Sequence, residues 1–191
     1  MALAPPGFER KILAPAEVAR WAARLPRPLV FTNGVFDILH RGHATYLARA
    51  RALGACLLVA LNGDASVRRL GKGPGRPVNA LEDRLALVAA LQPVDAVTWF
   101  EEDTPAALLA AVRPEVLVKG GDWPVERIVG AREVHARGGA VHSIAFEHQR
   151  STTALLRRVG ARAGVRKTAR RASAAKRKRP GAGSRGRRRA R

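Results

Sequence analysis

Residues 29–47, LVFTNGVFDILHRGHATYL, are the stretch that decides the fold. An apolar run over 29–31 ends at a Thr-Asn-Gly turn, and an apolar loop with one acid, Asp37, follows. Two histidines, His40 and His43, then flank a glycine where an amphipathic helix begins. This order predicts a buried strand, a tight loop and a helix N-terminus, which is where α/β sheets bind phosphate.

Four more apolar runs follow at the spacing of a strand–helix repeat, over residues 56–61, 94–100, 115–119 and 140–146. Helical periodicity predicts helices over residues 15–25, 43–54, 80–91, 105–112, 128–137 and 154–159. Five strands alternating with helices predict an α/β fold with a doubly wound, five-stranded parallel sheet of the Rossmann-like type.

The ends of several elements carry their own signals. Asn79 is expected to cap the helix over 80–91, and Thr104 to cap the next helix, with Pro105 in its first position. Residues 71–79, GKGPGRPVN, are rich in Gly and Pro and are expected to form an exposed, mobile loop. The first 14 residues are expected to be extended.

The net charge of +20 would suit a nucleic-acid-binding protein, but it is unevenly distributed. Fourteen of the 35 Lys and Arg residues lie in the last thirty residues, which contain no acid, and the remainder carries a net charge of +6. We therefore predict an N-terminal extension and helix over 1–27, one α/β domain over 28–160 and a disordered Lys/Arg-rich tail over 161–191. The tail is either a solvated extension without a task or a non-specific contact for polyanions.

Other compositional features bear on the compartment. The single cysteine, Cys56, opens an apolar run and is expected to be a buried thiol. No apolar run approaches the roughly 18 residues of a transmembrane helix, and the N-terminus lacks the basic-then-apolar order of a signal peptide. These features predict a cytoplasmic protein without a membrane span.

Polar clusters follow the predicted strands at their carboxyl ends, over residues 32–43, 62–64, 119–123 and 150–153. Ligands of parallel sheets bind at this edge. Imidazoles at a helix N-terminus can donate hydrogen bonds to phosphoryl oxygens and stabilise charge in a transition state. A zinc site is poorly supported, since no further Cys or His lies near the pair in sequence. The chain also has no GxxxxGK[ST] loop, so another arrangement must hold the nucleotide.

GVFDILHRGH resembles the HxGH signature of the nucleotidyltransferase superfamily, and RSTT at 150–153 resembles its second signature. Over about residues 10–158, LNGDASVRRL, GPGRPVN with LEDR, VDAVTWFEEDTP and RPEVLVKGGDWPVERIVGA resemble the adenylyltransferase domain of bacterial ADP-heptose synthesis. VKGGDW before IVGA is the most specific part. That domain is often fused to a sugar kinase, so the resemblance also implies a separate heptose kinase for this chain.

The resemblance implies transfer of AMP from ATP to D-glycero-β-D-manno-heptose 1-phosphate with Mg²⁺, releasing pyrophosphate, for the lipopolysaccharide core. It implies catalytic roles for His40, His43 and Lys119. The ATP-binding residues that it implies are Thr32, Asn33, Gly34 and Phe36 at the α-phosphate, and Arg150, Ser151, Thr152 and Thr153 at the outer phosphates.

Asn62 and Asp64 would line the sugar-phosphate or ribose side, and no metal-binding residue is assigned. Lys72 and Arg76 would close over the triphosphate, unless their segment is an ordinary solvated loop. Asp122 and Trp123 would contact the heptose, unless they form a plain turn with a packed Trp.

Further residues receive weaker assignments. Asp37 is expected to orient the loop or a histidine, and Arg84 to be a helix-surface or salt-bridge residue. Gly63 stands where the family pattern has a serine, and this difference is expected to alter phosphate or sugar contacts.

Two other functions stay open from the sequence. One is cytidylyl transfer to glycerol 3-phosphate or a related alcohol phosphate, which shares both signatures. The other is a basic nucleic-acid-binding protein with a vestigial nucleotide fold. The oligomeric state is open as well, with a homo-oligomer as one alternative.

Overall fold

Five parallel strands form the centre of the computed structural model, which describes residues 4–71, 73 and 75–147. The strands are β1 (Leu29–Gly34), β2 (Cys56–Asn62), β3 (Ala96–Phe100), β4 (Val116–Gly120) and β5 (Ala140–Ile144). Their order in the sheet is β3-β2-β1-β4-β5, and every neighbouring pair is parallel. The predicted fold class is confirmed. Lys72, the RSTT segment, the last predicted helix and the basic tail lie outside the described residues.

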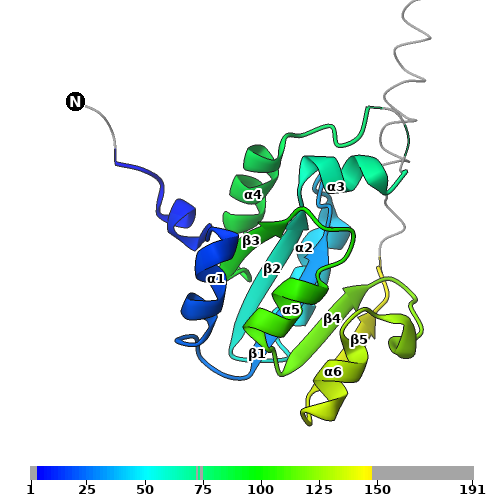
Figure 1. Cartoon of the computed structure of the whole chain (residues 1–191). Coiled ribbons are helices and arrows are strands. Elements are labelled where there is room, and N and C mark those ends of the chain that lie inside the picture. Colours follow the sequence, from blue (N-terminus) through cyan, green and yellow to red (C-terminus); the bar gives the residue numbers. More distant parts are fainter. Residues whose placement is uncertain (1–3, 72, 74, 148–191) are drawn as a thin grey trace, which may run out of the picture. The chain divides into compact units, whose positions relative to one another are not determined.

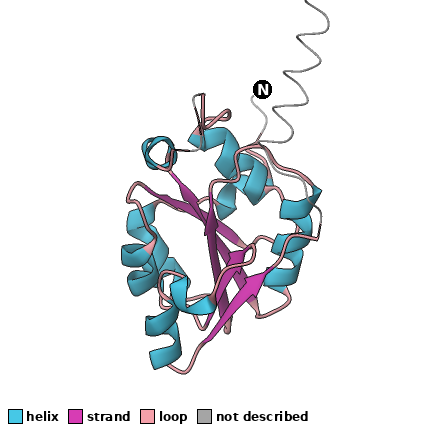
Figure 2. Cartoon of the chain, turned by 90° about the vertical axis from the view of Figure 1, so that its right-hand side faces the viewer, coloured by secondary structure: helices cyan, strands magenta, loops and turns pink. Residues whose placement is uncertain are grey.

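Helices cover both faces of the sheet (Figures 1 and 2). One face packs against α1 (Pro15–Ala22), α5 (Ala106–Val112) and α6 (Ala131–Ala136). The other packs against α2 (Arg41–Arg51) and α4 (Leu81–Ala89), while the short α3 (Asp64–Arg69) follows β2. Successive strand residues point to opposite faces, so Leu29 and Phe31 join the first layer and Val30 joins the second.

The direction of the strand order reverses between β1 and β4, and the connecting helices on the two sides of this point lie on opposite faces of the sheet. Helix α2 leads from β1 to β2 on one face, whereas α5 returns the chain from β3 to β4 on the other. Ligands of such sheets bind outside the carboxyl ends of the strands at this switch point. Residues 33–34 of β1 and 119–120 of β4 therefore mark the expected position of a site.

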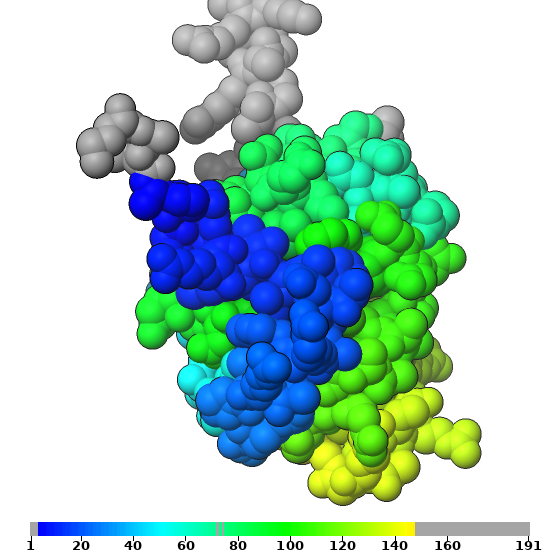
Figure 3. Space-filling view, turned by 60° about the vertical axis from the view of Figure 1, so that its left-hand side comes forward, coloured from blue at the N-terminus to red at the C-terminus, as the bar shows by residue number. Residues whose placement is uncertain are grey.

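The N-terminal segment is more ordered than predicted. Residues Gly7–Lys11 form a 3₁₀ helix (η1), and Ile12 pairs in parallel with Val97 at the outer edge of β3. Leu13 is buried in the same apolar layer as α1. Figure 3 shows these N-terminal residues, in blue, lying over this face of the molecule. The expectation of a merely extended entry segment was wrong, because its apolar side chains cover the sheet edge.

Helix starts differ from the predictions at three places. Helix α2 begins at Arg41, so His40 occupies the N-cap position rather than preceding the helix. Asn79 does not cap α4, because its amide donates to the carbonyl of Asp37 at 2.6 Å. Thr104 does not cap α5 either, since Pro105 holds the N-cap position without a side-chain hydrogen bond.

Two expectations from composition can be compared with the described residues. Cys56 is buried, and burial, with a smaller contribution from nearby Asp95, raises the pKa of its thiol to about 11. Within the described part of the chain, no helix is both long enough and apolar enough to cross a membrane.

Candidate active site

A cavity of about 500 Å³ opens at the carboxyl ends of β1 and β4, where the switch point lies. Eight of the residues predicted to bind or react with substrates lie in its wall: Asn33, Gly34, Phe36, His43, Asn62, Arg76, Lys119 and Trp123. They come from four separate segments of the sequence, so the fold brings together what the strand pattern placed at one edge.

The two histidines of the HxGH motif stack on each other. Their ring centroids are 3.9 Å apart with an interplanar angle of 16°, and His43 faces the cavity. The ring of His43 also meets Phe36 at 5.3 Å and the edge of Phe146 at 6.2 Å. Aromatic contacts on several sides restrict the imidazole to one orientation, which is what a preorganised hydrogen-bond donor requires.

Lys119 supplies a cation at the switch point. Its ammonium donates to the side-chain oxygen of Asn33 at 3.2 Å, across the boundary between β4 and β1. Both residues share the cavity wall with His43. The contact holds a positive charge in the same cavity wall as the imidazole, which suits the binding of anionic groups.

Thr32 lies behind the cavity wall. It is fully buried, with its hydroxyl 2.5 Å from the hydroxyl of Tyr46, which donates to the carbonyl of Val118 at 3.3 Å. Burial raises the pKa of Tyr46 well above its ordinary value, although the hydrogen bond with Thr32 opposes this shift. The trio joins β1, α2 and β4, and a contact of Thr32 with ATP stays a prediction.

The loop after β1 is tightly built around Phe36. This residue has a φ of 48°, in the left-handed region that non-glycine residues rarely adopt. Its ring lies over Gly34, where an added Cβ would be 2.9 Å from the ring. Such local strain is typical of functional loops. The position of the Phe36 ring is possible because residue 34 is a glycine and has no side chain.

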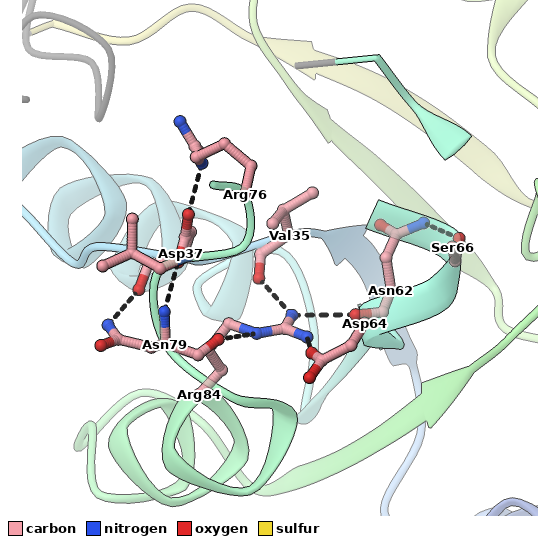
Figure 4. A network of polar contacts seen from close by, with 9 residues as sticks. Val35, Asp37, Asn62, Asp64, Ser66, Arg76, Asn79 and Arg84 are labelled. Atoms are coloured by element: carbon pink, nitrogen blue, oxygen red, sulfur yellow. Dashed lines mark hydrogen bonds and ion pairs between the residues drawn. The ribbon is translucent and has the colours of Figure 1, made fainter. Parts of the chain in front are cut away.

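Arg84 is the centre of a polar network beneath the cavity (Figure 4). It is 0% exposed, and Nη1 donates to the carbonyls of Val35 and Asn62, both at 2.8 Å. Its Nε donates to the carbonyl of Asn79 at 3.1 Å, and Nη2 to the Asp64 carboxylate at 2.6 Å. The helix-surface expectation for Arg84 was wrong, and the salt-bridge expectation is confirmed. Asp64 is therefore engaged outside the cavity wall, and its contact with a sugar or ribose stays a prediction.

The space beside Gly63 is taken by the end of a neighbouring side chain. A Cβ at this position would collide with the carboxylate of Glu101. Next to it, the amide of Asn62 donates to Ser66 at 3.0 Å, which fixes the residue at the end of β2. Glu101 is exposed, so its carboxylate would only have to move aside for the serine of the family pattern.

Asp37 fixes the end of the Gly/Pro-rich loop. One carboxylate oxygen accepts hydrogen bonds from the backbone N–H groups of Val78 and Asn79, at 2.8 and 3.0 Å. The other lies 2.5 Å from Nε of Arg76, and the two side chains are 1% and 8% exposed. The expectation of an exposed, mobile loop was therefore wrong for Arg76. Asp37 orients this second loop, and its predicted effect on its own loop or on a histidine stays a prediction.

Several cavity residues were missed from the sequence, namely Tyr46, Asp103, Thr104, Arg127 and Phe146. Asp103 and Thr104 lie three and four residues beyond the carboxyl end of β3, so the rule for parallel sheets could have found them, but Thr104 was interpreted as a helix cap. Phe146 follows β5, and its ring takes the space above Gly120. An isolated aromatic residue carries no such signal.

Other predicted residues are placed elsewhere. His40 and Asp122 are not in the cavity wall, although His40 touches it through His43. Trp123 is 51% exposed at the cavity mouth. Lys72, Arg150, Ser151, Thr152 and Thr153 lie outside the described residues. Over residues 4–71, 73 and 75–147, no group of three or more His, Cys, Asp or Glu side chains is arranged to hold a metal ion.

Comparison with known proteins identifies the family. Residues 31–158 match the model of the cytidylyltransferase-like family. The chain is 58% identical over 154 residues to D-beta-D-heptose 1-phosphate adenylyltransferase of Bordetella bronchiseptica, covering 80% of this chain and 95% of that protein. It is 55% identical over 131 residues to the bifunctional protein HldE of Ectopseudomonas mendocina, of which it spans only 28% while 69% of this chain is covered.

A solved structure agrees with this assignment. The lipopolysaccharide core biosynthesis protein from Thermoplasma volcanium superimposes with a TM-score of 0.52 at 29% identity, covering 64% of this chain and 98% of that one. Fold, cavity and sequence similarity thus point the same way. The chain belongs to the cytidylyltransferase-like family of nucleotidyltransferases and, within it, to the D-beta-D-heptose 1-phosphate adenylyltransferases.

Proposed function

We propose that the chain transfers AMP from ATP to D-glycero-β-D-manno-heptose 1-phosphate, giving ADP-heptose and pyrophosphate for the lipopolysaccharide core. The observation that carries the proposal is the convergence of Asn33, His43 and Lys119 on one cavity at the switch point. The identity of 58% with a heptose 1-phosphate adenylyltransferase supports the choice of nucleotide and acceptor.

The proposed chemistry needs positioning more than base catalysis. A sugar 1-phosphate is already anionic at neutral pH, so its oxygen can attack the α-phosphorus of ATP directly. The bond from that phosphorus to the bridging oxygen breaks, and pyrophosphate leaves with the electron pair. The barrier comes from bringing two polyanions into line and stabilising the crowded phosphorus centre.

The residues of the cavity suit this task. His43, with His40 stacked behind it, would donate to the phosphoryl oxygens, and Lys119 would balance the negative charge. Asn33, Gly34 and Phe36 would surround the α-phosphate. The RSTT segment, with Arg150, Ser151, Thr152 and Thr153, would bind the outer phosphates through hydroxyls and backbone amides.

Mg²⁺ is proposed as a companion of ATP. The described residues do not fit a metal held by the protein alone, because they contain no cluster of three or more suitable side chains. A triphosphate carries its own oxygen ligands, which suits an ion that prefers phosphate oxygens and water. No step of the proposed reaction is assigned to a protein-bound metal.

The test is pyrophosphate release across a matrix of nucleotides and acceptors. The proposal expects turnover with ATP and heptose 1-phosphate, and little with CTP. Preferred turnover of CTP with glycerol 3-phosphate would support the alternative cytidylyltransferase. Binding of DNA by a tail-less body that turns over no sugar phosphate would support a nucleic-acid-binding protein.

The proposed partners follow from the same reaction. A separate heptose kinase would supply the 1-phosphate in the cytoplasm, and a homo-oligomer is compatible with the reaction. The basic tail is proposed to contact polyanions without taking part in catalysis. Truncation after Gly160 should preserve adenylyl transfer and abolish salt-sensitive retention on DNA, whereas loss of transfer would place the tail in the active site.

A further inference from the structure

The ion pair of Asp37 and Arg76 places a buried guanidinium in the wall of the active-site cavity. We propose that Arg76 is a fixed binding residue for the phosphate group of the acceptor, and that Asp37 is its positioning residue. The inference rests on the proposed adenylyl transfer, since it assigns one of the two anions that the reaction must bring together.

The first step of the argument is that Arg76 is held in place. Its side chain is 8% exposed, and Nε lies 2.5 Å from a carboxylate oxygen of Asp37. Asp37 is itself fixed by the backbone N–H groups of Val78 and Asn79. Figure 4 shows the chain of contacts from Arg76 through Asp37 to Asn79 and on to Arg84. A side chain anchored in this way does not open and close as a lid.

The second step concerns the donors of Arg76 that remain. A guanidinium has five N–H groups in a planar fork, and the ion pair with Asp37 is at Nε, without a hydrogen bond between these two atoms. Among the described residues, Asp37 is the only side chain with which Arg76 forms an ion pair, and no carbonyl accepts a hydrogen bond from it. A nearly buried guanidinium with unused donors in a cavity is the arrangement expected for binding an anion.

The third step is the choice between the two anions. Arg76 is linked through Asn79 and Arg84 to the carbonyl of Asn62 at the end of β2. Lys119 lies at the end of β4, on the other side of β1. The cavity thus has Arg76 and Lys119 on two sides of the loop that follows β1. With the triphosphate assigned to His43 and Lys119, the fork of Arg76 is available for the phosphate of the acceptor, which it can bind in bidentate fashion.

The test compares Arg76→Gln and Arg76→Lys with the wild type. Arg68→Gln is the matched control, because Arg68 is an exposed arginine on the neighbouring α3. The Michaelis constant for heptose 1-phosphate is measured at saturating ATP, and the dissociation constant of ATP is measured by calorimetry without acceptor. Thermal unfolding of each variant reports on folding.

The proposal expects Arg76→Gln to raise the acceptor KM by about 10- to 100-fold, the scale of a lost hydrogen bond to a charged group. The ATP Kd should change less than about threefold on the same scale. Arg76→Lys keeps the charge without the fork and should recover part of the lost affinity. Arg68→Gln should leave both constants unchanged.

Two results would overturn it. An unchanged acceptor KM in both Arg76 variants would mean that Arg76 only stabilises the loop. A loss of ATP affinity as large as the rise in acceptor KM would assign Arg76 to the triphosphate. If Arg76→Gln does not fold, the comparison rests on Arg76→Lys. If the wild type prefers another phosphorylated acceptor, the proposed function fails, and the same comparison with that acceptor still decides the role of Arg76.

Discussion

Arg84 donates through Nη2 to a carboxylate oxygen of Asp64 at 2.6 Å, from a side chain that has no exposed surface. The same guanidinium also binds the carbonyls of Val35 and Asn62. One buried cation therefore joins the ends of β1 and β2 directly beneath the cavity. The geometry of the loop that carries Phe36 depends on this residue, although Arg84 itself does not line the cavity.

Replacing Arg84 should destabilise the domain strongly. Arg84→Met leaves three carbonyls and the Asp64 carboxylate without their donor; Asp64 is 33% exposed and can be solvated, so the loss of about 1–3 kcal/mol comes from the orphaned carbonyls. Urea unfolding should show this loss in the free energy of unfolding. Arg68→Met, at an exposed position, should change it by less than about 0.5 kcal/mol. A loss below about 1 kcal/mol for Arg84→Met would show that water replaces these contacts.

His43→Ala should lower kcat by about 10²-fold or more, which is the scale of losing one preorganised donor to a transition state. The folded state should survive, because the ring lies at a cavity wall. Pyrophosphate release at saturating substrates measures the effect, with His142→Ala on β5 as the control. Near-wild-type turnover of His43→Ala would contradict the phosphate-binding role of the imidazole.

Gly34→Ala should impair catalysis more than stability. The added Cβ would approach the Phe36 ring to 2.9 Å, so the ring and the loop must shift away from their positions beside His43. We expect kcat/KM to fall about tenfold or more, since small misplacements of a substrate-positioning loop reach 10²-fold. Gly7→Ala, where a Cβ meets nothing within 4 Å, is the control. An unaltered kcat/KM would mean that the loop adapts without loss.

Glu115 should contribute to the pH dependence of stability. Burial raises its pKa, but hydrogen bonds from the Leu29 N–H and the Arg27 guanidinium outweigh this and hold the pKa below its ordinary value of 4.5. The stabilisation is therefore present above pH 4.5 and is lost as the pH falls through the lower, folded-state pKa.

Urea unfolding from pH 7 to pH 3 should show Glu115→Gln less stable than the wild type at neutral pH, with the difference shrinking in acid. The same change at the exposed Glu126 serves as control. If the difference in the free energy of unfolding between Glu115→Gln and the wild type did not change with pH, the carboxylate charge would not be the source of the stabilisation.

The strand pattern and the HxGH motif predicted the sheet and the edge that carries the cavity. Lys119, for example, was placed at a strand end, and it meets Asn33 there. The connections between distant segments could not be predicted in this way. Helical periodicity treats a charged residue such as Arg84 as solvent-facing, and only the folded chain shows that four acceptors surround it.

Loop chemistry was the other source of error. A glycine- and proline-rich segment indicates a mobile backbone, but its composition does not show whether a residue distant in sequence binds the segment and fixes it. Asp37 is such a residue, and it fixes Arg76 and Asn79. The sequence predicted that Asp37 orients its own loop or a histidine, and its partners at Arg76, Val78 and Asn79 became visible only in the structure.

The pairing of Ile12 with Val97 has a practical consequence for anyone who expresses this domain alone. The family match begins at residue 31, and a fragment cut there would lose the cover of β3 as well as Leu13 and Val18 from the core. Its outer strand would then offer unpaired N–H and C=O groups and an apolar surface to other molecules, which is a known route to aggregation. The residues before β1 thus protect the edge of β3 and keep the domain from aggregating.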